Sequence, residues 1–210
     1  MTVTIAFEQY ELLDATTASD SFDASAGVQG SNLTLLVNEA NQRGYRAVAG
    51  SESAIGIRYR VRATAPVAAP EGETGEPVEE VVVEWFMRPL ENQSTNGQAA
   101  VVSAAIVAGS NSKRYEALVE AQEDDFLRAT EQLVVNGEIA DAHSWWSVMK
   151  ECLTDKCGGA CVTSLVACTG TWAAYLYCVA AACGLCWGKC VACEACDCSW
   201  WCRWGVGCCD

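Results

Sequence analysis

Fourteen cysteines are the residues whose chemistry is most evident in this sequence, and all of them lie in residues 152–210. Thiols at this density form disulfides in an oxidising compartment, and stay reduced or bind metal in a reducing one. A fragment of roughly 60 residues rarely buries enough apolar surface to fold without such cross-links. We therefore predict disulfide bonds for the whole set: Cys152, Cys157, Cys161, Cys168, Cys178, Cys183, Cys186, Cys190, Cys193, Cys196, Cys198, Cys202, Cys208 and Cys209.

The spacing of the cysteines predicts helices. Two sets recur at intervals of three, four or seven residues, so that each lines one helix face: Cys157, Cys161 and Cys168, then Cys183, Cys186, Cys190 and Cys193. A break at Gly170, between the sets, would let the two helices run antiparallel and face each other sulfur to sulfur. Disulfide geometry requires converging Cβ atoms, which favours bonds between helices over bonds within one. The connectivity stays open, because fourteen thiols allow on the order of 10⁵ complete pairings.

Metal binding and thiol redox chemistry are the alternatives to structural disulfides. Cys183-x-x-Cys186 and Cys193-x-x-Cys196 resemble two zinc knuckles, but only six residues separate them and the tail has no histidine. Cys183-Gly-Leu-Cys186 lacks the βαβ surroundings of a redox motif. We expect no metal and no cofactor, and an intracellular zinc-binding structural or regulatory protein is the alternative function.

The tail is also apolar enough for membrane insertion to be considered. No charged residue occurs between Lys156 and Lys189, a length that can span a bilayer. The cysteines and Gly170 interrupt this segment, which favours a buried hairpin, followed by an irregular Trp-rich end tied back by the last cysteines. After release, five tryptophans would suit a membrane interface: Trp172, Trp187, Trp200, Trp201 and Trp204. The other interpretation places these aromatic side chains in the core of a small disulfide-rich protein.

Charge separates the tail from the rest of the chain. Residues 1–151 carry 23 Asp and Glu against 10 Lys and Arg, whereas residues 152–210 carry 4 against 3. A strongly anionic body repels phosphate backbones, so nucleic acid is not expected as a partner. The acidic surplus and the scarcity of lysine suit a halophilic cell.

Hydrophobic periodicity predicts antiparallel strands in the body. Turn signals such as Asn96-Gly97 separate the apolar segments. Leu33, Leu36 and Ala40 share a helix face that Gly44 ends. We expect four or five strands, in residues 2–13, 54–62, 81–87, 99–108 and 114–120, with 123–142 a short helix or strand, 15–30 a loop and 63–77 an exposed connection.

The fold class follows from the strand periodicity of the body and the helical spacing of the cysteines in the tail. Residues 1–143 are predicted to form an acidic α+β domain with an antiparallel sheet and one main helix. Residues 144–210 are predicted to form a small α-helical, disulfide-rich hairpin domain. We expect the body's most basic stripe, Arg58, Arg60 and Arg62, to pair with nearby glutamates such as Glu80 and Glu84, although it also suits a docking face.

Nothing in the body predicts an enzyme. The single histidine, His143, has no candidate nucleophile nearby in sequence and stands before two tryptophans, which favours a packing or linker role. The sequence has no glycine-rich phosphate loop, no His-Glu-x-x-His and no Gly-x-Ser-x-Gly motif. We therefore expect no catalytic residues.

An acidic α+β body followed by a cysteine-dense tail resembles the precursors of cysteine-rich microhalocins, the halocin C-eight type of haloarchaeal bacteriocins. The resemblance covers Cys152 to Cys209, with Cys-x-x-Cys and Cys-x-x-x-Cys spacing, and includes the body's helix ending Gln42-Arg43-Gly44-Tyr45-Arg46. It implies that the tail is an antimicrobial peptide released by proteolysis, and that the body binds and restrains this peptide as an immunity segment. A target-cell membrane would be the second partner.

Cysteine content and the amino terminus point to different compartments. The disulfides predict a secreted or cell-surface protein after processing. The first residues, Met1-Thr-Val-Thr-Ile, show neither a basic region with an apolar run nor the twin arginine of the microhalocin family's leader. A leader missing from this chain, unconventional export and retention in the cell all stay open.

Overall fold

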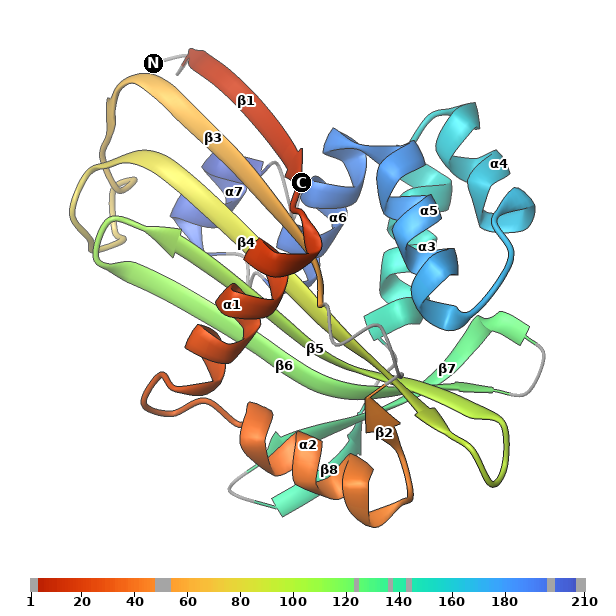
Figure 1. Cartoon of the computed structure of the whole chain (residues 1–210). Coiled ribbons are helices and arrows are strands. Elements are labelled where there is room, and N and C mark those ends of the chain that lie inside the picture. The colour runs from red at the N-terminus through yellow and green to blue at the C-terminus, as the bar shows by residue number, and fades with distance from the viewer. Residues whose placement is uncertain are drawn as a thin grey trace.

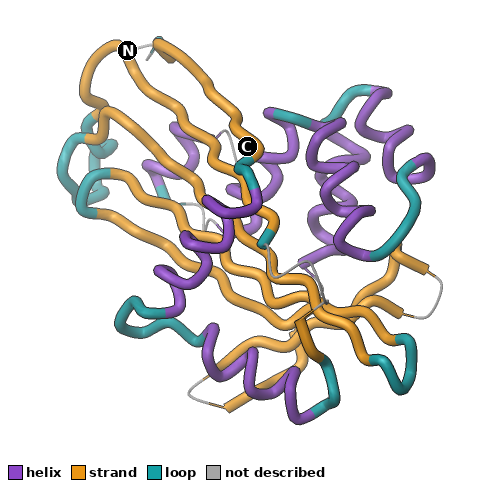
Figure 2. The backbone as a smooth tube through the Cα atoms, viewed as in Figure 1, coloured by secondary structure: helices purple, strands orange, loops and turns teal. Residues whose placement is uncertain are grey.

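The computed structural model describes residues 4–47, 54–122, 125–135, 138–142, 145–195 and 199–206. In these residues one antiparallel sheet runs through the molecule and helices cover both of its faces (Figure 1). Helices from the start of the chain lie on one face, and helices from its end lie on the other, as the tube of Figure 2 also shows. The predicted fold class, an α+β part followed by a disulfide-bonded helical part, is confirmed.

The sheet has eight strands among the described residues, more than the four or five expected, in the order β1-β3-β4-β5-β6-β7-β8 with β2 paired to β4. From β3 onward each strand pairs with the next in the chain, which confirms the predicted antiparallel meander. The turn at Asn96, whose φ is +54°, joins β4 to β5 at Asn96-Gly97. The strands are β1 (Ile5–Leu12), β2 (Arg46–Ala47), β3 (Ile55–Val67), β4 (Val78–Asn92), β5 (Gly97–Ala108), β6 (Asn111–Gln122), β7 (Asp125–Val135) and β8 (Glu138–Ala142).

One strand boundary differs from expectation. β3 continues to Val67, through Pro66, although residues 63–77 were expected to be an exposed connection. The pairing of β3 with β4 shifts register between Arg62 and Val67, and this irregular stretch accommodates a proline that cannot donate a ladder hydrogen bond. The ambiguous segment 123–142 contributes the strands β7 and β8.

The segment expected to be a loop, residues 15–30, contains helix α1 (Ala15–Ala26). Asp14 caps it by accepting a hydrogen bond from the Thr17 amide at 3.0 Å. Ala18 and Phe22, one turn apart, are buried against the sheet. The prediction was wrong because tertiary burial outweighs the weak helix propensity of the many Ser, Thr and Asp residues in this segment.

Helix α2 (Leu33–Gln42) confirms the one helix that was predicted. Leu33, Leu36 and Ala40 are fully buried, and Gly44 follows the helix at a φ of +88°. Glu116 of β6, itself buried, accepts hydrogen bonds from the Ser31 hydroxyl at 2.8 Å and from the Asn32 amide at 2.5 Å. A carboxylate from the sheet therefore caps α2.

Five helices follow the last strand. α3 (Trp145–Lys156) and α6 (Leu185–Ala195) form one pair, and α4 (Gly159–Ala167) and α5 (Trp172–Cys183) form another. α7 (Trp200–Val206) packs on β3 and β4. A helix here corrects the expectation of an irregular Trp-rich end.

The alternation of side chains along the strands creates two cores. Ile57, Tyr59 and Val61 face the C-terminal helices in the larger core, while Phe86 and Leu118 face α1 and α2 in the smaller one. The two parts of the chain therefore share a core, with the sheet between two helical layers.

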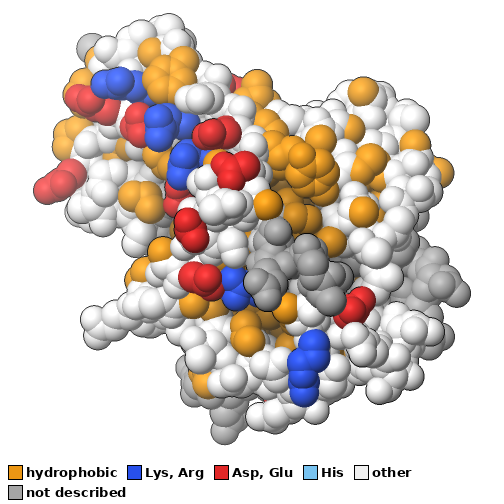
Figure 3. Space-filling model, in the orientation of Figure 1, with side chains coloured by type: hydrophobic (Ala, Val, Ile, Leu, Met, Phe, Trp, Pro, Cys, Tyr) orange, Lys and Arg blue, Asp and Glu red, His pale blue; other side chains and the backbone are white. Residues whose placement is uncertain are grey.

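The arginine stripe of β3 lies on the opposite face of the sheet from Tyr59. Arg58 pairs with Glu84 at 2.8 Å and Arg60 pairs with Glu80 at 3.4 Å, as expected. Basic and acidic side chains are interleaved on this side of the molecule, at the upper left of Figure 3. The ion pairs support a solvated strand face.

Candidate functional site

The candidate site is the set of tail disulfides together with the surface that the tail presents to the sheet. Four bonds are nested, each enclosing the next along the chain: Cys152–Cys190, Cys157–Cys186, Cys161–Cys183 and Cys168–Cys178. Cys193 and Cys202 are also disulfide-bonded, and the described part of the chain has no free cysteine. The disulfide prediction is thus confirmed for these ten cysteines, whereas Cys196, Cys198, Cys208 and Cys209 lie outside the described residues, as does His143.

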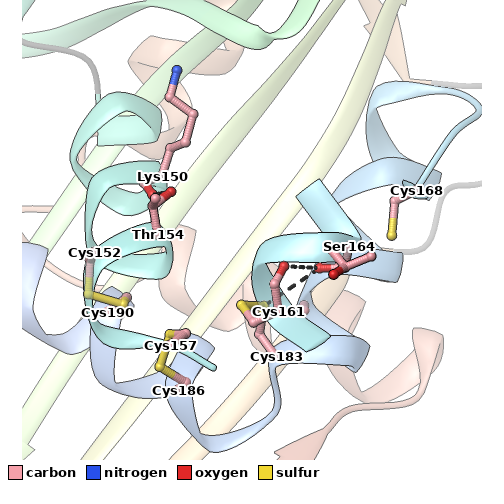
Figure 4. The surroundings of a disulfide bond; sticks show 12 residues. Lys150, Cys152, Thr154, Cys157, Cys161, Ser164, Cys168, Cys183, Cys186 and Cys190 are labelled. Carbon is pink, nitrogen blue, oxygen red and sulfur yellow. Dashed lines mark hydrogen bonds between the residues drawn. A yellow bond between two sulfur atoms is a disulfide. The ribbon is translucent and has the colours of Figure 1, made fainter. Parts of the chain in front are cut away.

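The nested order results from a chain reversal at Gly170, whose φ of +116° favours glycine. This confirms the predicted break and the predicted preference for bonds between helices. Tyr175 donates its hydroxyl proton to the Leu165 carbonyl at 2.9 Å and so links α5 to α4. The Ser164 hydroxyl donates to the Cys161 carbonyl at 2.6 Å and lies 3.9 Å from the Cys183 sulfur (Figure 4).

Each arm of the hairpin is two helices rather than one. Gly184, at a φ of +53°, ends α5, and α6 starts at an angle of 110° to it. Cys183 and Cys186 therefore belong to different helices, although their spacing suggested one. Cys183 and Cys186 also do not form a zinc knuckle, because each is bonded to a different cysteine across the hairpin.

Trp187 on α6 joins the tail to the sheet. It is fully buried, and its ring meets Trp85 of β4 edge to face, with centroids 5.5 Å apart. Trp146 of α3 lies on its other side at 6.2 Å. The next residue, Gly188, brings the α6 backbone onto β3, since a Cβ atom there would lie 2.8 Å from the Cβ of Tyr59.

Helix α7 makes a second close approach to the sheet. Trp200, Trp201 and Cys202 are buried, and a Cβ atom at Gly205 would lie 2.9 Å from the Cβ of Val81. Of the tryptophans predicted for a membrane interface, Trp187, Trp200 and Trp201 thus lie in the core beneath the tail, and Trp204 is partly buried against it. The side chain of Trp172 lies outside the described set.

Polar contacts also join the tail to the body. Lys189 lies 3.1 Å from Glu8 of β1, and Arg203 of α7 lies 2.5 Å from Glu73. The Tyr10 hydroxyl donates to the carbonyl of Ala180 at 2.9 Å. Burial is the main cause that raises the pKa of Tyr10 far above its ordinary value. Lys189 and Arg203, two of the three basic residues in residues 152–210, are thus paired with acids of the body.

Several large apolar side chains are exposed on the outer surface of the tail. Val166 is 80% exposed, Tyr177 47% and Leu185 41%. Apolar side chains are spread over the lobe at the right of Figure 3, in contrast to the charged strands at the left. Among the described helices none is by itself long and apolar enough to cross a membrane; α5 and α6 together meet the criteria of length and composition, as a bent pair.

Sequence reasoning missed the body residues that hold the tail, chiefly Glu8, Tyr10 and Tyr59. No local pattern marks them, because their partners are more than a hundred residues away. The sequence did contain a signal for the contact at Gly188. A glycine inside a helix costs about 1 kcal/mol, so its presence often marks a place where the helix backbone lies close to another segment.

Comparison of the chain with known protein families, curated proteins and solved structures found no match. In its architecture the cross-linked hairpin covers one face of the sheet and is held there by packing and a few polar contacts.

Proposed function

We propose that the chain is the precursor of an antimicrobial peptide of the bacteriocin or halocin type. Residues 144–210 supply the peptide, and residues 1–143 restrain it or give immunity to it. One observation carries the proposal: the body has no cysteine, so every disulfide of the monomer is internal to the tail, and the tail is joined to the sheet only by the chain itself and by noncovalent contacts.

This arrangement suits release by proteolysis. A cut between β8 and α3 would leave all the tail cross-links intact, including Cys152–Cys190, which starts seven residues into α3. Each closed loop contributes about 2–4 kcal/mol to the stability of the piece that contains it. The freed peptide would therefore keep its hairpin without the body.

The face that the sheet covers is the one that a released peptide would expose. Trp187, Trp200 and Trp201 lie on it, and an exposed apolar patch rich in tryptophan partitions into a membrane interface. The segment between Lys156 and Lys189 adds no charge that would oppose this. In the precursor the body occupies this face, which supports a restraining role.

The disulfides indicate an oxidising, extracellular environment. We propose accordingly that the processed peptide acts outside the cell, either secreted or at the cell surface. Its target would be the membrane of related cells.

A growth-inhibition assay tests the proposal. Purified, oxidised residues 145–210 should inhibit related cells, and added residues 1–142 should protect them. A body carrying Tyr59→Arg is the matched control, because its charge in the covered face should abolish protection. No inhibition at any dose would count against the toxin role, and inhibition that the body does not relieve would count against the restraining role.

A further inference from the structure

Two neighbouring disulfides gather four sulfur atoms between α3 and α6. The sulfurs of Cys157, Cys186 and Cys190 lie within 4.8 Å of one another. The fourth, that of Cys152, is bonded to Cys190. Figure 4 shows the two bonds side by side and separate from Cys161–Cys183. One joins α6 to α3, and the other joins α6 to Cys157, the residue that follows α3. No other group of three metal-ligating side chains this close occurs in the described residues.

The cluster has the composition of a four-thiolate structural zinc site, and three of its sulfurs already lie near the separation that zinc requires. Zinc is held by four thiolates at about 2.3 Å, which places the sulfurs roughly 3.8 Å apart at the corners of a tetrahedron. The Cα atoms of the bonded pairs are 5.8 and 6.0 Å apart, so that modest rotations of the side chains would open the required space once the bonds are reduced.

The backbone at the cluster is also held by contacts other than the disulfides. Trp187, between Cys186 and Cys190, is packed between Trp85 and Trp146. Trp146 lies in the first turn of α3, the helix that carries Cys152. Breaking the two bonds therefore leaves α3 and α6 anchored in one aromatic core, with their cysteines still facing each other.

The electrostatic surroundings favour thiolates. Lys156 directly precedes Cys157, and Lys189, whose ammonium group pairs with Glu8, directly precedes Cys190. Cys186 stands in the first turn of the eleven-residue helix α6, where backbone amides favour negative charge. Glu151, next to Cys152, and Asp155, three residues after it, are both exposed.

We infer that in the reduced protein Cys152, Cys157, Cys186 and Cys190 bind one zinc ion. Reduction of the two bonds takes four electrons and four protons, and zinc then displaces the four thiol protons. Two equivalents of a disulfide oxidant reverse the change by accepting four electrons, re-forming both bonds and releasing the ion. The site would hold α3 against α6 in a reducing compartment, before oxidation, and it does not depend on the antimicrobial role.

Cobalt(II) binding to the full chain tests this site. The chain is reduced with a phosphine under argon and titrated with cobalt(II), then with zinc(II). We expect one equivalent of cobalt with thiolate charge-transfer and tetrahedral absorption bands, lost on addition of zinc. The double variant Cys157→Ser, Cys186→Ser should lose these bands, and the matched variant Cys161→Ser, Cys183→Ser should keep them. A reduced chain that binds no cobalt, or equal bands in both variants, would overturn the inference.

Alkylation of the wild-type chain gives a second readout that does not need a variant to fold. With zinc present, iodoacetamide should label Cys178, which is exposed on α5, but spare the four proposed ligands, as peptide mass spectrometry would show. Without zinc all five should be labelled. Uniform labelling in zinc, or protection confined to the cysteines after Cys190, would contradict the assignment.

Discussion

Gly188 of α6 lies directly against Tyr59 of β3, so close that a Cβ atom at residue 188 would be 2.8 Å from that of the tyrosine. The contact joins the cysteine-rich tail to the middle of the sheet. Because the backbone of α6 meets the Cβ and Cγ atoms of Tyr59 here, neither partner can move far enough to admit a side chain at residue 188. This contact makes Gly188 the most sensitive small residue of α6.

Replacing Gly188 by alanine should lower stability by about 1–3 kcal/mol, because the overpacking outweighs the gain in helix propensity. Thermal unfolding of the full chain measures this. Gly159→Ala is the control, since nothing lies within 4 Å of that position, and it should be neutral or slightly stabilising. Equal melting temperatures for the two variants would contradict the close contact.

Trp187→Ala should cost about 3–5 kcal/mol, since it empties the space between Trp85 and Trp146. Urea unfolding gives the loss. Tyr177→Ala removes an aromatic ring that is 47% exposed and should cost far less. If both losses were alike, Trp187 would not be the anchor between tail and sheet.

Tyr10→Phe removes the hydrogen bond to the Ala180 carbonyl and should cost about 0.5–1.5 kcal/mol. The change leaves the ring in place, so that the loss reports on the hydroxyl alone. Chemical unfolding of the variant and of the wild-type chain measures it. An unchanged unfolding midpoint would show that this contact adds nothing to docking.

Stability should fall in alkaline solution. Burial raises the pKa of Tyr10 and Tyr59 far above the ordinary value, and raises that of Tyr45 to about 12. A raised folded pKa means that stability is complete below the unfolded pKa of about 10 and is lost as pH rises through the folded value. Melting temperature should therefore decline above about pH 10, less steeply in Tyr59→Phe. A flat profile to pH 12 would refute the burial argument.

The native mass should show a fully oxidised tail. Seven bonds among fourteen cysteines lower the intact mass by two hydrogens each relative to the reduced protein. Mass spectrometry with and without reductant measures the difference. A native chain with the reduced mass and one bound zinc would instead favour the intracellular zinc protein.

Most of the secondary structure could be predicted from local pattern. The meander from β3 to β6 followed from alternating apolar residues and the Asn96-Gly97 turn, and α2 followed from three leucine and alanine positions on one face. Helix α1 was missed because most of its residues are polar. Its two buried residues, Ala18 and Phe22, stabilise the helix only through packing against the sheet. The break at Gly184 was missed because cysteine spacing continues across it.

The confinement of the cross-links to the tail follows from residue types alone, and a break at Gly170 with bonds between helices could be expected from glycine conformation and disulfide geometry, because all of these are local properties. Only the tertiary structure decided which cysteines pair and where the apolar face of the tail is buried. Both depend on packing between distant segments, such as Gly188 on Tyr59, and periodicity shows that a face is apolar without showing what covers it.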